Sequence, residues 1–132
     1  MIEYLGFNSD NIPPAPNMLA DLQKQIGHVL PAAFLEVILS NTLIIAVDNE
    51  FEAGDNSSSI ENFIPLNNMA TEYAQFCAVK NVTNLLPFAE DGMGNHICIH
   101  LEAGPTNGEI SFWDHEEATA VKVFGSIYAL IS

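Results

Sequence analysis

The segment PFAEDGMGNHICIHLE, residues 87–102, carries the clearest structural pattern in the chain. A short apolar run leads into Glu90 and Asp91, two glycines follow, and the residues after them alternate in polarity as they do along a β-strand. Gly92 and Gly94 can adopt the positive φ that a tight reversal of the chain requires. The segment therefore predicts a strand, a tight turn and a second strand.

This turn does not match two common kinds of glycine-containing ligand loop. A dinucleotide fingerprint has a third glycine and opens a helix, whereas the glycines here precede a strand. A calcium loop needs its glycine at the sixth position and a glutamate at the twelfth, and the turn has neither. In the acidic segment 48–59, counted from Asp48, Gly54 falls one place late and Ser59 stands at the twelfth position. We therefore expect a structural turn.

Alternation along HICIHLE (96–102) assigns its side chains to two faces of a strand. The face expected to point into the core consists of Ile97, Ile99 and Leu101. The other face consists of His96, Cys98, His100 and Glu102. His96 and His100, with His115 across a predicted hairpin, are residue types that bind zinc. A half-covered polar sheet face explains the same pattern, so a metal site at these three histidines is an alternative only.

No residue pattern makes a positive case for catalysis. Cys98 lies beside histidines, but no nucleophile, histidine and acid stand at a recognisable spacing. A buried cysteine more often acts as a small hydrophobic side chain. Acids are so plentiful that no carboxylate pair stands out. We therefore expect no enzyme activity, no catalytic residue and no cofactor.

Helical spacing of apolar residues predicts three helices before this segment. The first begins after Asn17 and ends at Gly27. The second begins at Pro31, a residue suited to a first helical position, and runs on through an apolar stripe. The third covers residues 67–79, where Met69, Tyr73, Phe76 and Cys77 recur at helical intervals.

The other segments are expected to form strands, one loop and a final helix. Residues 42–47 and 60–66 indicate strands, and 48–59 indicates a polar loop. GPTNG (104–108) is a turn by composition, so the strands on its two sides should form an antiparallel hairpin. A last helix is expected with acids 116–117 in its first turn. Its apolar stripe consists of Val121, Phe124, Tyr128 and Ile131.

Length and composition indicate one folded domain. The chain has 132 residues, of which 48% are hydrophobic, and it has no apolar run near the length of a membrane span. Its start lacks the basic and apolar regions of a signal peptide. Two cysteines, Cys77 and Cys98, do not make a disulfide framework. We expect a soluble protein of the reducing cytoplasm.

The charge is strongly negative. Seventeen acids stand against three lysines and no arginine, which gives a formal net charge of −14. Such a field repels nucleic acid and anionic membranes and speeds encounter with a basic partner. The lack of arginine also argues against phosphate or nucleotide chemistry. An alternative is that the acids only keep the protein soluble.

Three segments in this order resemble the SUKH superfamily, which contains bacterial toxin-immunity proteins and a fungal cell-wall-assembly regulator. They are IGHVLPAAFLEVILSN (26–41), PFAEDGMGNHICI (87–99) and GEISFWDHEE (108–117). The first is similar to the family's helix pair around a Leu-Pro dipeptide. The second and third are similar to its acidic-glycine turn and to its strand that ends in an aromatic-Asp-His-Glu signature.

The resemblance implies an α+β fold, a mostly antiparallel sheet flanked by helices, in a single domain over 1–132 with an extended lead-in at 1–16. It also implies a non-catalytic role, in which the protein binds and neutralises a bacterial toxin, often a nuclease. Since a nuclease presents a basic surface to phosphate, the negative charge agrees with such a partner. An intracellular regulatory scaffold of the same fold is the alternative, and neither nucleic acid nor membrane is expected as a partner.

The residues expected to contact the toxin are acids on predicted loops and turns. They are Asp48, Glu50, Glu52, Asp55, Glu61, Glu90 and Asp91.

Overall fold

The computed structural model describes residues 3–4, 16–39, 44–45, 50–53, 56–64 and 66–129. Its helices are α1 (Pro16–Ile26), α2 (Ala32–Leu39), α3 (Leu66–Lys80) and a 3₁₀ turn, η2 (Ile127–Ala129). Its strands are β1 (Glu3–Tyr4), β2 (Ile44–Ile45), β3 (Glu50–Ala53), β4 (Asn56–Ser59), β5 (Asn62–Phe63), β6 (Leu85–Glu90), β7 (His96–His100), β8 (Ile110–Asp114) and β9 (Thr119–Phe124).

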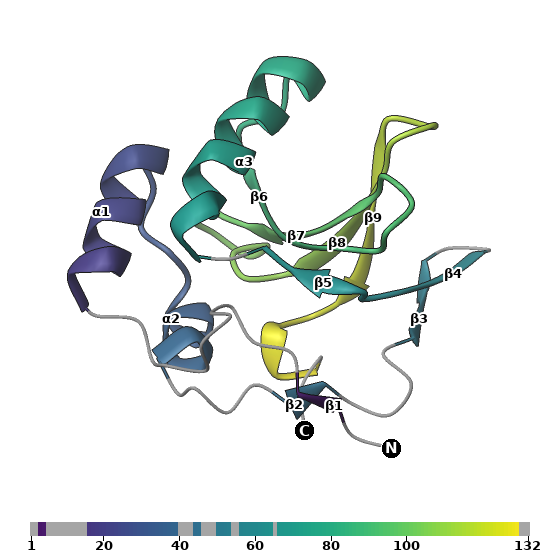
Figure 1. Ribbon diagram of the computed structural model, residues 1–132, viewed down its shortest axis with the longest axis horizontal. Coiled ribbons are helices and arrows are strands. Elements are labelled where there is room, and N and C mark those ends of the chain that lie inside the picture. Colours follow the sequence, from purple (N-terminus) through teal and green to yellow (C-terminus); the bar gives the residue numbers. More distant parts are fainter. Residues whose placement is uncertain are drawn as a thin grey trace.

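The main sheet of the described residues has five antiparallel strands in the order β5-β6-β7-β8-β9 (Figure 1). The predicted hairpin around residues 104–108 is present as β7 and β8, with His96 opposite Trp113 and Ile99 opposite Ile110. Two further pairs, β1 with β2 and β3 with β4, form separate two-stranded sheets. The predicted α+β architecture is therefore confirmed.

The helices pack around this sheet, with α1 beside α3 and α3 beside β6 (Figure 1). Gly27 ends α1 at φ 75°, as the sequence predicts, and its N–H donates to the Gln23 carbonyl at 2.9 Å. The Gln23 side chain then accepts a hydrogen bond from Leu30 N at 2.8 Å, which fixes the short link to α2. The predicted third helix is confirmed as α3.

The principal core lies on the face of the sheet that carries Ile97 and Ile99, both fully buried as predicted. Phe34 from α2 meets Phe88 from β6 edge-on, with ring centroids 5.5 Å apart. Each of these side chains is fully buried, and such burial is worth about 1.5–3 kcal/mol. This packing couples α2 to the central strands.

A smaller cluster covers part of the opposite face. It consists of Phe76, Leu85, Cys98 and Trp113. Phe76 from α3 contacts Trp113 edge-on at 5.2 Å and His96 at 5.9 Å between ring centroids. Cys98 is fully buried, and this burial raises the pKa of its thiol. Cys98 is therefore an inert hydrophobic side chain.

The predicted C-terminal helix is wrong. Residues 119–124 form β9, which pairs with β8, and the chain then makes only the short turn η2 within the described residues. Thr119, Val121 and Val123 alternate along the chain, and their β-branched side chains suit a strand. The 116–117 acids consequently lie in a turn between strands, and Ile131 lies outside the described residues.

The predicted loop over 48–59 is also wrong. Its described residues form a β-hairpin in which Glu52 lies opposite Ser57 and Ala53 opposite Asn56. Ala53 is buried in the principal core, and this burial ties the hairpin to the domain. Of the predicted strand at 42–47, the described part is β2. The strand predicted at 60–66 is present only as the short strand β5.

Candidate functional site

Three chain connections meet at one end of the main sheet. Because the strands are antiparallel, the entry into β5, the β6–β7 turn and the β8–β9 turn lie at the same end. The acids at this end are Glu61, Glu90, Asp91, Asp114, Glu116 and Glu117. We call these six residues the acidic end. The topology therefore gathers charges that are up to 56 positions apart in the sequence (117 − 61).

Asp91 organises the β6–β7 turn. One carboxylate oxygen, Oδ1, accepts hydrogen bonds from the N–H groups of Met93 at 2.8 Å and Asn95 at 3.1 Å. The other, Oδ2, accepts from Asn95 Nδ2 at 2.8 Å and from the Ser58 hydroxyl at 3.0 Å. Burial favours a higher pKa for Asp91, but these hydrogen bonds outweigh it and hold the pKa below its usual value. Asp91 is therefore a buried, ionised residue that shapes the turn.

Asn95 and His115 join this turn to the β8–β9 turn. Asn95 Oδ1 accepts from the His115 N–H at 3.0 Å and lies 2.6 Å from His115 Nδ1. Since an amide oxygen can only accept, the histidine proton sits on Nδ1. Gly94 has φ 92°, and a Cβ there would lie 3.2 Å from the His115 ring. The two turns therefore form one hydrogen-bonded unit.

Asp114 shapes the β8–β9 turn from within. Its Oδ1 accepts from the N–H of Glu116 at 2.9 Å and from that of Glu117 at 3.2 Å. Both glutamate side chains are exposed. Sequence reasoning missed these two residues as surface candidates because it placed them in a helix. The alternation of Thr119, Val121 and Val123 indicates a strand, and a strand there would have placed these two glutamates in an exposed turn.

A pocket of about 350 Å³ opens where β4 meets the β6–β7 turn. Its lining consists of Ser57, Ser58, Ser59, Glu61, Asp91 and Met93. Glu61 accepts a hydrogen bond from the Ser59 hydroxyl at 3.0 Å, and its side chain passes over Gly92. Two of the predicted contact residues, Glu61 and Asp91, thus share one pocket.

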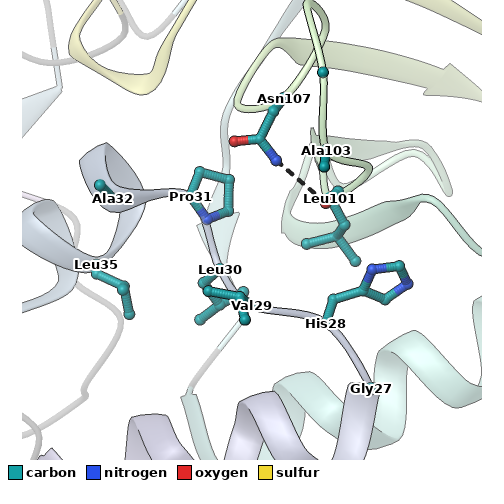
Figure 2. A pocket seen from close by; sticks show the side chains of 11 residues that line it. Gly27, His28, Val29, Leu30, Pro31, Ala32, Leu35, Leu101, Ala103 and Asn107 are labelled. Atoms are coloured by element: carbon teal, nitrogen blue, oxygen red, sulfur yellow. Dashed lines mark hydrogen bonds between the residues drawn. The ribbon is translucent and has the colours of Figure 1, made fainter.

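A larger hollow of about 720 Å³ lies near the end of β7 that points away from the acidic end. It lies between the α1–α2 link and the β7–β8 turn (Figure 2). Its lining is mostly apolar and includes Val29, which is 78% exposed. Asn107 donates from Nδ2 to the Leu101 carbonyl at 3.2 Å and so holds one wall. No predicted contact residue lines this hollow.

The structure brings only some of the predicted contact residues together. Glu61, Glu90 and Asp91 meet at the acidic end, where Glu61 is exposed and Glu90 half-buried. Glu52 is exposed on β3, and Glu50 begins that strand. Two more predicted contacts, Asp48 and Asp55, lie outside the described residues.

The three histidines of the metal alternative do not converge. His100 follows His96 by four positions along β7, which places them about 13 Å apart at the usual rise of a strand. His100 Nε2 lies 2.9 Å from the Ser111 hydroxyl, and His115 is bonded to Asn95. Among the residues that the structure describes, no group of three or more His, Cys, Asp or Glu side chains is arranged to hold a metal ion.

The family model of the SMI1/KNR4 family (SUKH-1) matches residues 13–132. The chain belongs to the SMI1/KNR4 family. This finding confirms the resemblance seen in the sequence, and it agrees with the observed helices and antiparallel sheet. A comparison with individual curated proteins gave no match. None of the helices in the described segments is long and apolar enough to cross a membrane.

Membership of this family supports one of two roles, an immunity protein or a regulatory scaffold. Both roles depend on binding a protein partner, and the family is generally non-catalytic.

Proposed function

We propose that this SUKH-1 protein is an immunity protein that binds and neutralises a cognate basic toxin in the bacterial cytoplasm, without catalysis. The family supports a role in protein binding. The net charge of −14 favours a basic partner over an acidic one. A nuclease is the leading toxin class because its active site must attract phosphate.

The observation that carries this proposal is the convergence at the acidic end. Three connections each contribute exposed or half-exposed carboxylates to one end of the sheet, including Glu61, Glu90 and Glu117. Hydrogen bonds at Asp91, Asn95 and Asp114 hold these connections in place. A preorganised charged surface loses little conformational entropy when it binds. The β3–β4 hairpin, with Glu50 and Glu52, extends the proposed contact surface, as do the predicted contacts Asp48 and Asp55.

The test is coexpression with the product of the adjacent gene. We expect cells that express that product alone to stop growing, and cells that also express this protein to recover. The double variant E116Q/E117Q should protect poorly, because it removes two exposed charges from the acidic end.

The matched control is D21N/E102Q, which removes two exposed charges from α1 and from the β7–β8 connection. It should protect as the wild type does. A neighbouring gene product that is harmless, or a complex whose formation leaves growth unaffected, would favour the regulatory scaffold instead.

A further inference from the structure

The 350 Å³ pocket at the acidic end is built by two separate parts of the chain. Ser57 to Ser59 and Glu61 come from the β3–β4 hairpin and the residues after it, and Asp91 and Met93 come from the β6–β7 turn. The bond from the Ser58 hydroxyl to Asp91 joins the two parts across 33 positions of sequence. Asp91 is only 6% exposed, so its carboxylate lies on the floor of the pocket.

The hydrogen-bonding groups of this pocket leave acceptors facing any occupant. The Ser58 hydroxyl donates a hydrogen bond to Asp91 Oδ2, and the Ser59 hydroxyl donates one to Glu61 Oε1, both at 3.0 Å. A serine hydroxyl has one proton and two lone pairs. Because each hydroxyl proton already takes part in a hydrogen bond, these two hydroxyls can only accept further hydrogen bonds. The Glu61 carboxylate keeps free acceptor sites as well. The four bonds to Asp91 already occupy the lone pairs of its two oxygens, so Asp91 contributes its charge to the pocket and not a free acceptor.

No cation of the described chain neutralises these carboxylates. In the segments that the structure describes, the ion pair within 4 Å is Lys122 Nζ with Glu109 Oε2, at 2.9 Å. The hydrogen bonds to Asp91 all come from neutral groups, and they hold its pKa below the usual value, so the charge persists at neutral pH. The pocket therefore carries negative charge that would attract a cation of a partner.

The side chain of Met93 completes the pocket with an apolar surface. It is 76% exposed, so its apolar surface is open to a partner, as is that of three other large hydrophobic residues of the described segments, Val29, Val79 and Tyr128. Methionine is flexible and polarizable, and it adapts to irregular apolar partners. Lysine and arginine side chains carry an apolar stem behind a charged head, and such a stem packs well on a thioether.

We propose that this pocket receives a lysine or arginine side chain of the protein partner, with the charged head bonded to Glu61 and attracted by the buried charge of Asp91, and with the stem against Met93. Both side chains are donors only, which matches a lining of acceptors. Because this inference rests on the proposed function for its partner, its test must work without the toxin as well as with it.

The test without toxin is an amide NMR titration with N-acetylargininamide and N-acetyllysinamide as probes. We expect saturable shifts at Ser57, Ser58, Ser59 and Met93, with an affinity no tighter than about millimolar, because an exposed ion pair contributes little free energy. The two probes show which cation fits better. N-acetylcitrullinamide, a neutral analogue of the arginine probe, should leave these signals unchanged. Shifts that do not saturate, or equal shifts with the citrulline probe, would overturn the proposal.

The matched variants are E61Q and E117Q, which each remove one exposed charge of the acidic end. Only Glu61 lines the pocket, so E61Q should weaken probe binding about fivefold and E117Q should not. Equal weakening by both variants would mean that the probes sense only the general field and would overturn the pocket assignment.

Titration of the toxin distinguishes this inference from the proposed function. A toxin that binds E61Q and E117Q equally well contradicts the pocket but leaves the immunity role standing. Selective probe binding together with a failure of any toxin to bind supports the cation pocket and contradicts the immunity role.

Discussion

Asn95 and His115, which are 20 positions apart in the sequence, connect two turns of the main sheet. The main-chain N–H and Nδ1 of His115 both contact Asn95 Oδ1, at 3.0 and 2.6 Å. The same asparagine donates to Asp91 through Nδ2 at 2.8 Å. One amide group thus bridges the β6–β7 and β8–β9 turns, and the acidic residues that we propose as the binding surface depend on it for their placement.

The first prediction concerns this bridge. Asn95→Ala removes the contacts to His115 and one donor to the buried carboxylate of Asp91. We expect it to lower the free energy of unfolding by about 1–3 kcal/mol, the cost of leaving a buried charged group underbonded. Urea denaturation measures this loss. Asn107→Ala, which removes one bond from a more exposed asparagine, should cost less, and equal losses would contradict the bridging role.

The second prediction concerns Gly94. A Cβ at this position would approach the His115 ring to 3.2 Å, and its φ of 92° is unfavourable for other residues. Gly94→Ala should therefore lower the free energy of unfolding by about 1–3 kcal/mol. Gly27 also has a positive φ, 75°, but a Cβ there would have nothing within 4 Å. Gly27→Ala should thus be the milder variant, and the reverse order would contradict the close packing of the two turns.

The third prediction concerns pH. Burial lowers the pKa of His96 and the positive charge of Lys80 acts in the same direction, against the negative charges of Glu90, Glu72 and Asp91, which raise it. The unfolded chain therefore binds the proton more readily than the folded chain. The stability that His96 contributes is complete above the ordinary histidine pKa of 6.5 and is lost as the pH falls through the lower folded value.

Urea midpoints measured from pH about 7.5 down to about 5.5 should accordingly fall. His100 adds to the same trend, because burial lowers its pKa too, against Glu109 and Glu102. The variant H96Q should show a flatter profile than the wild type. A midpoint that rises on acidification in this range would contradict the burial of these histidines.

The fourth prediction concerns the two thiols. Cys98 is fully buried and its pKa is raised, whereas Cys77 is partly exposed on α3. A thiol reagent should modify Cys77 in the native protein and reach Cys98 only when the protein unfolds, because the thiolate is the reactive form. Mass spectrometry of the modified peptides measures both sites. Fast native labelling of Cys98 would contradict the packing of Phe76 and Trp113 over the sheet.

Local patterns in the sequence predicted the centre of this fold but not its edges. The alternation in 96–102 and the turn composition of 104–108 predicted the β7–β8 hairpin and the buried isoleucines. Residues 119–131 carry two periods at once, because Val121, Phe124 and Tyr128 have helical spacing while Thr119, Val121 and Val123 alternate. Pairing with β8 stabilises the strand in place of the helix. This pairing is a long-range effect that local periodicity does not contain.

The candidate site was predicted only in part for the same reason. Glu61, Glu90 and Asp91 were chosen for charge and position on turns, but Asp91 turned out to be a buried acceptor of four hydrogen bonds. In the hairpin of residues 50–59, β3 alternates polar and apolar residues over only four positions, and its partner β4 has no apolar residue, so the second strand lacks the apolar alternation that marks a strand. Its contact with Asp91 through Ser58 therefore has no local signal in the sequence.

The most direct test of the central claim, that the acidic end binds a basic toxin, is the salt dependence of that binding. Isothermal titration of the toxin encoded beside this protein should give a dissociation constant that rises steeply with salt. E116Q/E117Q should bind more weakly at low salt with a shallower dependence, while D21N/E102Q should follow the wild type. An affinity indifferent to salt, or equal losses in both double variants, would contradict the account.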